Sequence, residues 1–217
     1  MIQGVLTHTK PTDAEKAYTK IKGKIITAKM SPGSVINEAQ LMEEFALGRT
    51  PIREAVKQLQ MEDLVIVTPR KGMFVADIAV TDLTQIFEVR VEIESFATRL
   101  AAQRITEQEI TQLQKLAAAI QEVDTLEKEC LINLDGEFHA LLAEATHNKF
   151  LIKEIEYYYN LSLRIWYVAL KYATPEDFDI HAHIEIFEAI QAQDAKKAGQ
   201  RMRRHVQDFH KTIKQYI

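Results

Sequence analysis

The spacing of hydrophobic positions along this chain changes near residue 75. Before it, apolar side chains form two short β-rich runs, LVIV and MFV, on either side of the turn sequence TPRKG. After it, apolar side chains recur every three or four positions, which is the spacing of one helix face. The sequence therefore predicts a mainly α-helical protein in two domains. Residues 1–77 would hold short helices and a β-hairpin, and residues 78–217 an all-α antiparallel bundle of about six helices.

The region before the hairpin predicts three helices. A first helix is expected over about 11–30, and Asn37 is placed to cap a second, which carries Leu41, Met42 and Phe45 on one face. A short turn containing Gly48 follows. Thr50 is the expected N-cap of a third helix, with Pro51 at its first position. Its apolar face would consist of Ile52, Ala55, Val56 and Leu59. A helix pair followed by a hairpin is the order of a winged helix-turn-helix.

Basic side chains gather where such a fold would meet DNA. Arginine near the start of the third helix can pair bidentately with guanine in the major groove. Basic residues at the hairpin tip can reach phosphates or the minor groove. The candidate DNA-contacting residues are Arg49, Thr50, Arg53, Lys57, Arg70, Lys71 and Gly72. The pattern alone leaves a second interpretation open, in which these residues form the solvated face of a small helical core.

Charge and composition narrow the class of protein. Residues 1–75 hold 11 lysines and arginines against 8 acidic residues, whereas the whole chain has a formal net charge of −4. A basic N-terminal part on an acidic body is consistent with local DNA contact. The single cysteine excludes an internal disulfide framework. We expect no membrane span and no signal peptide, and hence a cytoplasmic protein.

The second half contains four candidate metal ligands. Helices are expected over about 81–104, 106–125, 126–145, 149–172, 175–191 and 194–217. Asp135 and His139 lie one turn apart on the third of these, whereas His183 and His205 lie on the fifth and sixth. If they converge, one oxygen and three nitrogen ligands would suit Zn²⁺, Ni²⁺ or Fe²⁺. The alternative is that each is an isolated surface or core residue, because spacing does not establish convergence.

Longer segments resemble a known family. The run GRTPIREAVKQLQMEDLVIVTPRKGMFV resembles the winged helix-turn-helix of the GntR family, except that Gly48 stands where the family usually has serine. The segments DGEFHALLAEATHN and HIEIFEAIQAQDAKKAGQRMRRHV look like the FCD ligand-binding domain of the FadR subfamily. The segment IFEVRVEIESFATRLAA resembles the opening helix of that domain. Together these resemblances cover nearly the whole chain.

The resemblance implies a DNA-binding transcriptional regulator, with repression as the expected mode. It implies a homodimer that binds a palindromic double-stranded DNA operator. It also implies a divalent metal ion, Zn²⁺ or Ni²⁺ first, whose ligands are Asp135, His139, His183 and His205. The expected effector is a small organic acid held beside the metal. Arg90 and Arg164 are the candidate side chains for its second oxygen.

Two alternatives remain at this point. The helical half could be a metal-dependent hydrolase or lyase, which would need a general base beside an open metal position. Glu137 and Glu144 lie close in sequence, but nothing singles out either, and an enzyme leaves the helix-turn-helix and hairpin unexplained. The metal could also be a structural staple in a regulator.

Overall fold

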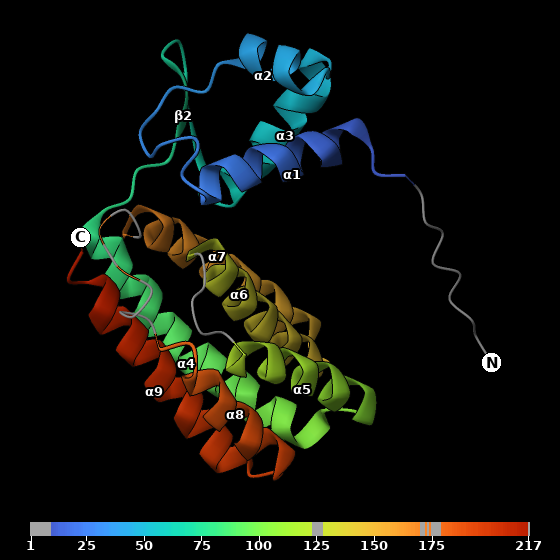
Figure 1. The fold of residues 1–217 in the computed structure, drawn as a ribbon. Helices are drawn as coiled ribbons and strands as arrows, with labels where there is room; N and C mark the ends of the chain where they lie inside the picture. Colours follow the sequence, from blue (N-terminus) through green and yellow to red (C-terminus); the bar gives the residue numbers. More distant parts are fainter. Residues whose placement is uncertain (1–9, 123–127, 170–171, 173, 175–178, 217) are drawn as a thin grey trace. The chain divides into compact units, whose positions relative to one another are not determined.

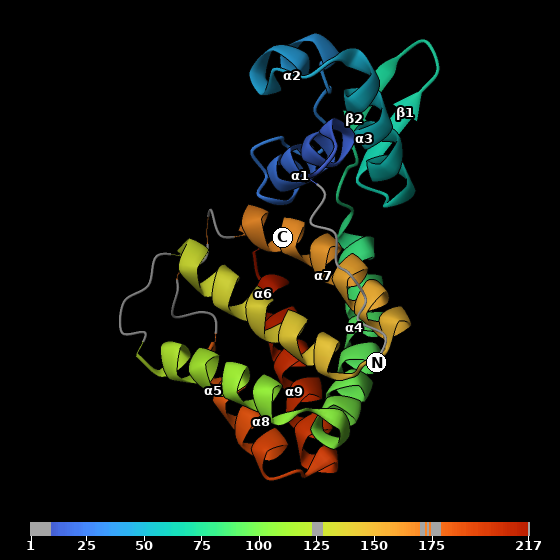
Figure 2. The same cartoon turned by 90° about the vertical axis from the view of Figure 1, so that its right-hand side faces the viewer.

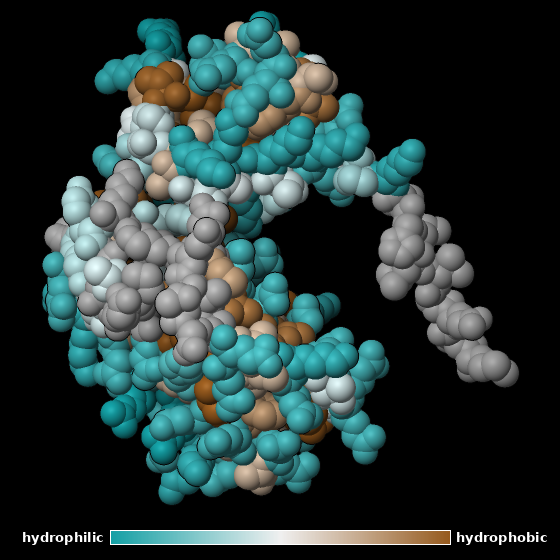
Figure 3. Space-filling model, in the orientation of Figure 1, coloured by the Kyte–Doolittle hydropathy of each residue, from teal (hydrophilic) through white to brown (hydrophobic). Residues whose placement is uncertain are grey.

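A computed structural model describes residues 10–122, 128–169, 172, 174 and 179–216. The chain forms two compact units, Met1–Asp77 and Ile78–Ile217, which are considered separately below (Figure 1). The described residues hold nine α-helices and one two-stranded sheet, which confirms the predicted fold class. Among them, no helix combines the length and apolar character that a membrane crossing requires. Among the residues that are coloured in Figure 3, hydrophilic side chains predominate on this face of the second unit.

The first unit contains three helices and a hairpin. The elements are α1 (Asp13–Ile26), α2 (Glu38–Phe45), α3 (Arg49–Met61), β1 (Val65–Thr68) and β2 (Gly72–Val75). Helix α1 packs along α3, and their contact buries Ile21 and Ile25 from one helix and Ile52 and Leu59 from the other. Figure 2 shows the hairpin next to α3, as its contacts with β1 require. This small core holds α3 and the hairpin in fixed positions.

The start of α3 differs from the sequence prediction. The helix begins at Arg49, Gly48 is its N-cap, and Thr50 and Pro51 are its second and third residues. The turn after α2 begins at Ala46, which adopts a left-handed conformation with φ 54°, and it is complete by Gly48. Proline is tolerated at the third position because the first N–H groups of a helix have no intrahelical partner. The predicted cap at Asn37 is present, since its side chain accepts from the N–H groups of two α2 residues.

The hairpin is antiparallel and lies one residue later than the predicted runs on its first strand. Val65 pairs with Val75 and Thr68 with Gly72, so the tip is formed by residues 69–71. Gly72 has φ of 114°, a conformation that favours glycine. The N–H of Ile36 donates to the carbonyl of Met73 at 2.8 Å, which ties the segment before α2 to the hairpin.

The second unit is a bundle of six helices. They are α4 (Val80–Arg104), α5 (Glu107–Gln121), α6 (Lys128–Ala145), α7 (Lys149–Ala169), α8 (Ala182–Gln191) and α9 (Ala195–Ile213). The predicted capping box at Thr106 is present, because its hydroxyl accepts from Glu109 N–H and the Glu109 carboxylate accepts from Thr106 N–H. The predicted start of α8 at Pro175 is wrong. The helix begins at Ala182, whose N–H donates to the Asp179 carboxylate, and residues 175–178 lie outside the described part.

Helix α4 is the central element of this bundle. It contacts α6, α7, α8 and α9, and it runs beside α9 over much of its length (Figure 1). Gly199 of α9 permits this close approach, because a Cβ there would lie 2.9 Å from the backbone oxygen of Ser95. The apolar core runs between the helices and includes Phe87, Phe138 and Ile186. Polar side chains at the middle of this core form the site described next.

Candidate metal centre and DNA-binding surface

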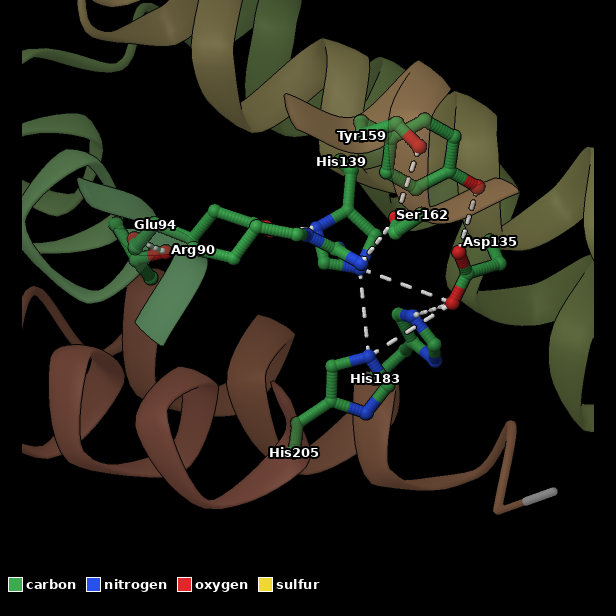
Figure 4. Close-up of polar contacts among 9 residues, drawn as sticks. Arg90, Glu94, Asp135, His139, Tyr159, Ser162, His183 and His205 are labelled. Carbon is green, nitrogen blue, oxygen red and sulfur yellow. Dashed lines mark hydrogen bonds and ion pairs between the residues drawn. The ribbon is translucent and has the colours of Figure 1, made fainter. Parts of the chain in front are cut away.

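Three helices bring the four predicted metal ligands together. Asp135 and His139 lie one turn apart on α6, His183 is in the first turn of α8, and His205 is at the middle of α9 (Figure 4). One ligand atom from each of these residues lies within 4.8 Å of the other three. His183 is fully buried, Asp135 and His139 are buried, and His205 is partly buried. The cluster therefore forms inside the bundle rather than on its surface.

The ligand atoms face one another across a short gap. The Nε2 atoms of His139 and His205 are 3.3 Å apart. Asp135 Oδ1 lies 3.2 Å from His183 Nε2 and 3.7 Å from Nε2 of each of the other two histidines. The set is one carboxylate oxygen and three imidazole nitrogens, which is typical of a transition-metal site.

Hydrogen bonds on the outer side of the ligands orient three of them. His139 Nδ1 contacts the Glu94 carboxylate, and His183 Nδ1 donates to the carbonyl of Ile180 at 2.7 Å. The Tyr159 hydroxyl donates to Asp135 Oδ2 at 2.7 Å, which leaves Oδ1 directed into the cluster. Metal-binding histidines usually donate their second N–H in this way, because the bond fixes the tautomer and the ring plane.

One nitrogen of the cluster has no hydrogen-bond partner, and a bound cation would supply one. His183 Nε2 is buried and makes no hydrogen bond, although Asp135 Oδ1 lies close to it. Because His183 Nδ1 is the donor to Ile180, Nε2 of the neutral ring carries the lone pair that a metal ion would bind. These residues therefore fit a bound divalent cation.

The cluster also shifts the pKa values of its members in opposite directions. Burial alone would lower the pKa of His139, but the carboxylates of Glu94 and Asp135 outweigh burial and raise it to about 9. Burial, with repulsion from His183, lowers the pKa of His205 to about 4. Burial would raise the pKa of Glu94, yet Arg90 and His139 lower it to about 2. Adjacent imidazoles thus differ in proton affinity because one faces two carboxylates.

Arg90 reaches the site, but it is already held by other side chains. Its Nε donates to Glu94 at 2.5 Å and its Nη1 donates to the hydroxyl of Ser162 at 2.7 Å. The guanidinium also lies over the rings of Phe87 and Tyr159, 5.3 and 5.2 Å from their centroids. Sequence reasoning missed Glu94, although its position four residues after Arg90 on one helix is a signal for such a pair.

Arg164 is placed differently. It is buried, but it lines neither of the two cavities beside the cluster. Arg164 comes two residues after Ser162 on α7, and two residues turn a helix by about 200°. The side chain of Arg164 therefore lies on nearly the opposite face of α7 from that of Ser162. The geometry therefore gives no support to its predicted contact with an effector.

Two cavities adjoin the cluster. The smaller, of about 10 Å³, is lined by Arg90, His139 and Ser162 and has room for about one water molecule. The larger, of about 280 Å³, lies beside α8 and α9 and is lined by His181, Arg201 and Thr212 among others. Asp135, Trp166, His205 and Phe209 line both. Within the part of the chain that the structure describes, a small ligand reaching the cluster thus has room on the α8–α9 side and not in the smaller cavity.

The structure provides no general base for the hydrolase alternative in the residues named for it. Glu137 and Glu144 are exposed and line a separate hollow between α5 and α6. They lie on the side of α6 away from Asp135 and His139.

Most of the predicted DNA-contacting residues share one groove in the first unit. A groove of about 820 Å³ runs between α3 and the hairpin, and its lining includes Arg49, Arg53, Lys57, Arg70 and Gly72. All five are exposed, as are Thr50 and Lys71, which are not among its lining residues. The arrangement places arginines at the start of α3 opposite a basic hairpin tip.

One acidic residue of this groove was missed. Glu38, at the start of α2, accepts two hydrogen bonds from Arg53, at 2.7 Å from Nε and 3.2 Å from Nη2. Arg49 Nε lies 3.9 Å from the same carboxylate. The hydrogen bonds and the charge of Glu38 raise the pKa of Arg53. The guanidinium that we predicted to read bases is therefore oriented by a carboxylate within the groove.

Comparisons with protein families match both units. Residues 85–208 match the FCD domain, and residues 13–75 match the family described as bacterial regulatory proteins, gntR family. The first match alone covers more than half of the chain.

Individual relatives extend along the chain. It is 28% identical over 193 residues to the HTH-type transcriptional regulator YdhC of Bacillus subtilis, covering 87% of this chain and 85% of that protein. It is 25% identical to the HTH-type transcriptional repressor RspR of Escherichia coli, covering 99% and 94%. Among solved structures, E. coli McbR/YncC has the same fold, with a TM-score of 0.84, 20% identity, and coverage of 94% and 98%.

Proposed function

Because this chain belongs to the GntR family of bacterial regulatory proteins, in its FCD-containing FadR subfamily, we propose that it is a repressor controlled by a small carboxylate. As a family member it is a DNA-binding transcriptional regulator and not an enzyme. Repression is supported by the similar RspR, which is a repressor. The assignment of residues 1–77 to DNA binding and 78–217 to effector binding follows the two compact units. Such a regulator acts on the chromosome, which places it in the cytoplasm.

The DNA-reading role is assigned to the groove between α3 and the hairpin. Arg49 and Arg53 at the N-terminal end of α3 contact bases, Lys57 contacts phosphate, and the hairpin tip engages the neighbouring groove or phosphates. Two copies of the chain pair as a homodimer. Their recognition helices then enter successive major grooves of a palindromic operator, about 34 Å apart.

The effector-binding role is assigned to the metal centre. Asp135, His139, His183 and His205 would hold a divalent ion, with Zn²⁺ or Ni²⁺ best suited to these donors. These four residues would leave a position for a carboxylate oxygen only on an ion that takes five or six ligands. The chain's own groups orient the ligands and exclude water, through Glu94, Tyr159 and the apolar core.

A single observation carries the metal assignment. Ligand atoms from three separate helices converge inside the bundle, and a buried His183 nitrogen faces a carboxylate oxygen with no hydrogen bond. A buried polar atom without a partner is costly, and a cation bound by these four ligands would remove that cost. Effector binding then bears on α4, because Arg90 and Glu94 lie on that helix and α4 follows the first unit directly in the chain.

The test combines metal content with operator binding. The full chain is loaded with Zn²⁺ or Ni²⁺, and its affinity for its operator is followed by fluorescence anisotropy while small carboxylates are added. We expect a carboxylate that weakens operator binding, and we expect chelation to remove its effect. If metal-loaded and metal-free protein respond equally to every carboxylate, the metal is a structural staple and the effector assignment fails.

A further inference from the structure

The charged groups around the metal centre set how much negative charge a ligand can bring. Arg90, which was predicted to bind an effector oxygen, is paired with Glu94, and both side chains are buried at 4% and 2% exposure. Glu94 also contacts His139 Nδ1, so it faces two donors and is a carboxylate. The positive charge of Arg90 is therefore cancelled within the protein before any ligand arrives.

The remaining charge can be counted from the described residues at the cluster. Arg90 and Glu94 cancel, and Asp135 contributes one negative charge. An imidazole that binds a metal ion is neutral. A bound divalent cation would therefore leave the centre with one positive charge in excess. One carboxylate on the ligand neutralises the centre, whereas a second carboxylate bound at the metal would leave an excess negative charge in the core, which is strongly unfavourable.

The larger cavity does not offer a second carboxylate a favourable site either. Its described wall outside the metal cluster carries two arginines against three acids, Asp179, Glu185 and Asp208, so its net charge is negative. Arg201 pairs with Glu185 at 2.8 Å and Arg204 with Asp208 at 3.4 Å, while Asp179 adds another acid. These groups can donate to and accept from hydroxyls. The wall thus suits an uncharged polar tail.

We propose that the metal centre selects a ligand with a single negative charge. This ligand is a monocarboxylate whose uncharged, hydroxylated tail lies in the cavity beside α8 and α9, and Glu94 is the residue that imposes the charge limit. The proposal rests on the proposed carboxylate-sensing function and sharpens it, because it excludes dicarboxylates as the preferred class.

The experiment uses pairs of probes that differ only in a second carboxylate. Metal-loaded full-length protein is titrated calorimetrically with glycerate and tartronate, threonate and tartrate, and gluconate and glucarate. We expect each bound monocarboxylate to bind at least about tenfold more tightly than its dicarboxylate, which corresponds to about 1.4 kcal/mol. A dicarboxylate that binds as tightly or more tightly overturns the proposal and leaves carboxylate sensing intact.

A substitution of Glu94 tests whether this residue sets the preference for a single negative charge. Glu94→Gln raises the positive charge of the centre by one, so we expect it to narrow or reverse the preference. The control is Glu144→Gln, an exposed residue on α6, which should leave the preference unchanged. Unchanged preference in a Glu94→Gln protein that still holds metal, measured by elemental analysis, overturns the role of Glu94.

Glu94 contacts the metal ligand His139, so Glu94→Gln could lose its metal. A second variant tests the proposal in that case. Glu185→Gln frees Arg201 in the cavity wall, away from the cluster, and should strengthen dicarboxylate binding more than monocarboxylate binding. No gain for any dicarboxylate overturns the placement of the tail. If no probe of either class binds in a metal-dependent way, the proposed function fails, and this proposal fails with it.

Discussion

The two units use the same pair of side chains, an arginine bound by a glutamate, in opposite surroundings. In the DNA-binding groove, the side chains of Arg53 and Glu38 are 63% and 20% exposed. In the metal centre, those of Arg90 and Glu94 are 4% and 2% exposed. Both pairs use the arginine Nε, but Arg53 alone donates a second bond to its carboxylate.

Exposure decides what each pair can do. An ion pair in water is weak and screened by salt, so DNA can compete for Arg53 at little cost. A buried pair does not exchange its partner readily, because separating the two side chains leaves an unpaired charge in the core. The same chemistry therefore gives an exchangeable arginine in the groove and a fixed charge balance in the bundle.

The largest effect is expected when one of the metal-ligating side chains in the buried centre is removed. We expect His183→Ala to reduce metal content from near-stoichiometric to background, because His183 is the fully buried ligand with an unpartnered nitrogen. Elemental analysis after dialysis measures it. His181→Ala, an exposed histidine two residues earlier, is the matched control and should retain metal. Full metal occupancy in His183→Ala would contradict the assigned site.

The next test compares the two glutamates directly. We expect Glu94→Ala to lower the free energy of unfolding of metal-free protein by about 3–5 kcal/mol, since Arg90 is left buried and unpaired. Glu38→Ala should leave the free energy of unfolding nearly unchanged, because Arg53 is solvated without it. Urea unfolding measures both. Equal effects of the two variants would refute the contrast between the pairs.

A third test concerns DNA. We expect Arg53→Ala to weaken operator binding about ten- to a hundredfold and to relax specificity at one base, with no change in melting temperature. Fluorescence anisotropy with operator variants measures it. Lys29→Ala, an exposed residue after α1 and away from the groove lining, is the control and should retain both affinity and specificity. Unchanged affinity in Arg53→Ala would mean that another part of α3 reads the operator.

The smallest effect is expected at the outer side of the metal centre. Tyr159→Phe removes the hydroxyl that holds Asp135, so metal affinity should fall about tenfold without unfolding. Competition with a chromogenic chelator measures it. Tyr158→Phe removes a hydroxyl from the preceding residue and should leave metal affinity unchanged. Equal affinities in both variants would show that the Tyr159 bond does not orient the ligand.

Local sequence patterns were sufficient for most elements of the fold. Helix periodicity, the Thr106 capping box and the Asn37 cap identified helices and several of their starts, because these signals involve residues within one or two turns. The start of α3 was misplaced because its N-cap is Gly48 and not Thr50, and a glycine has no capping side chain to mark the position. The start of α8 was placed too early, because Asp179, whose carboxylate accepts from the N–H of the first helical residue, lies inside the predicted helix.

The candidate site divides in the same way. The sequence by itself determined the ligand types and the i, i+4 spacing of Asp135 and His139, and family resemblance suggested the other two histidines. Only the tertiary structure decided that α6, α8 and α9 bring them within reach of one another, that Glu94 neutralises Arg90, and that Arg164 faces elsewhere. Convergence and charge balance depend on how separate helices pack, and no local pattern along one helix contains that information.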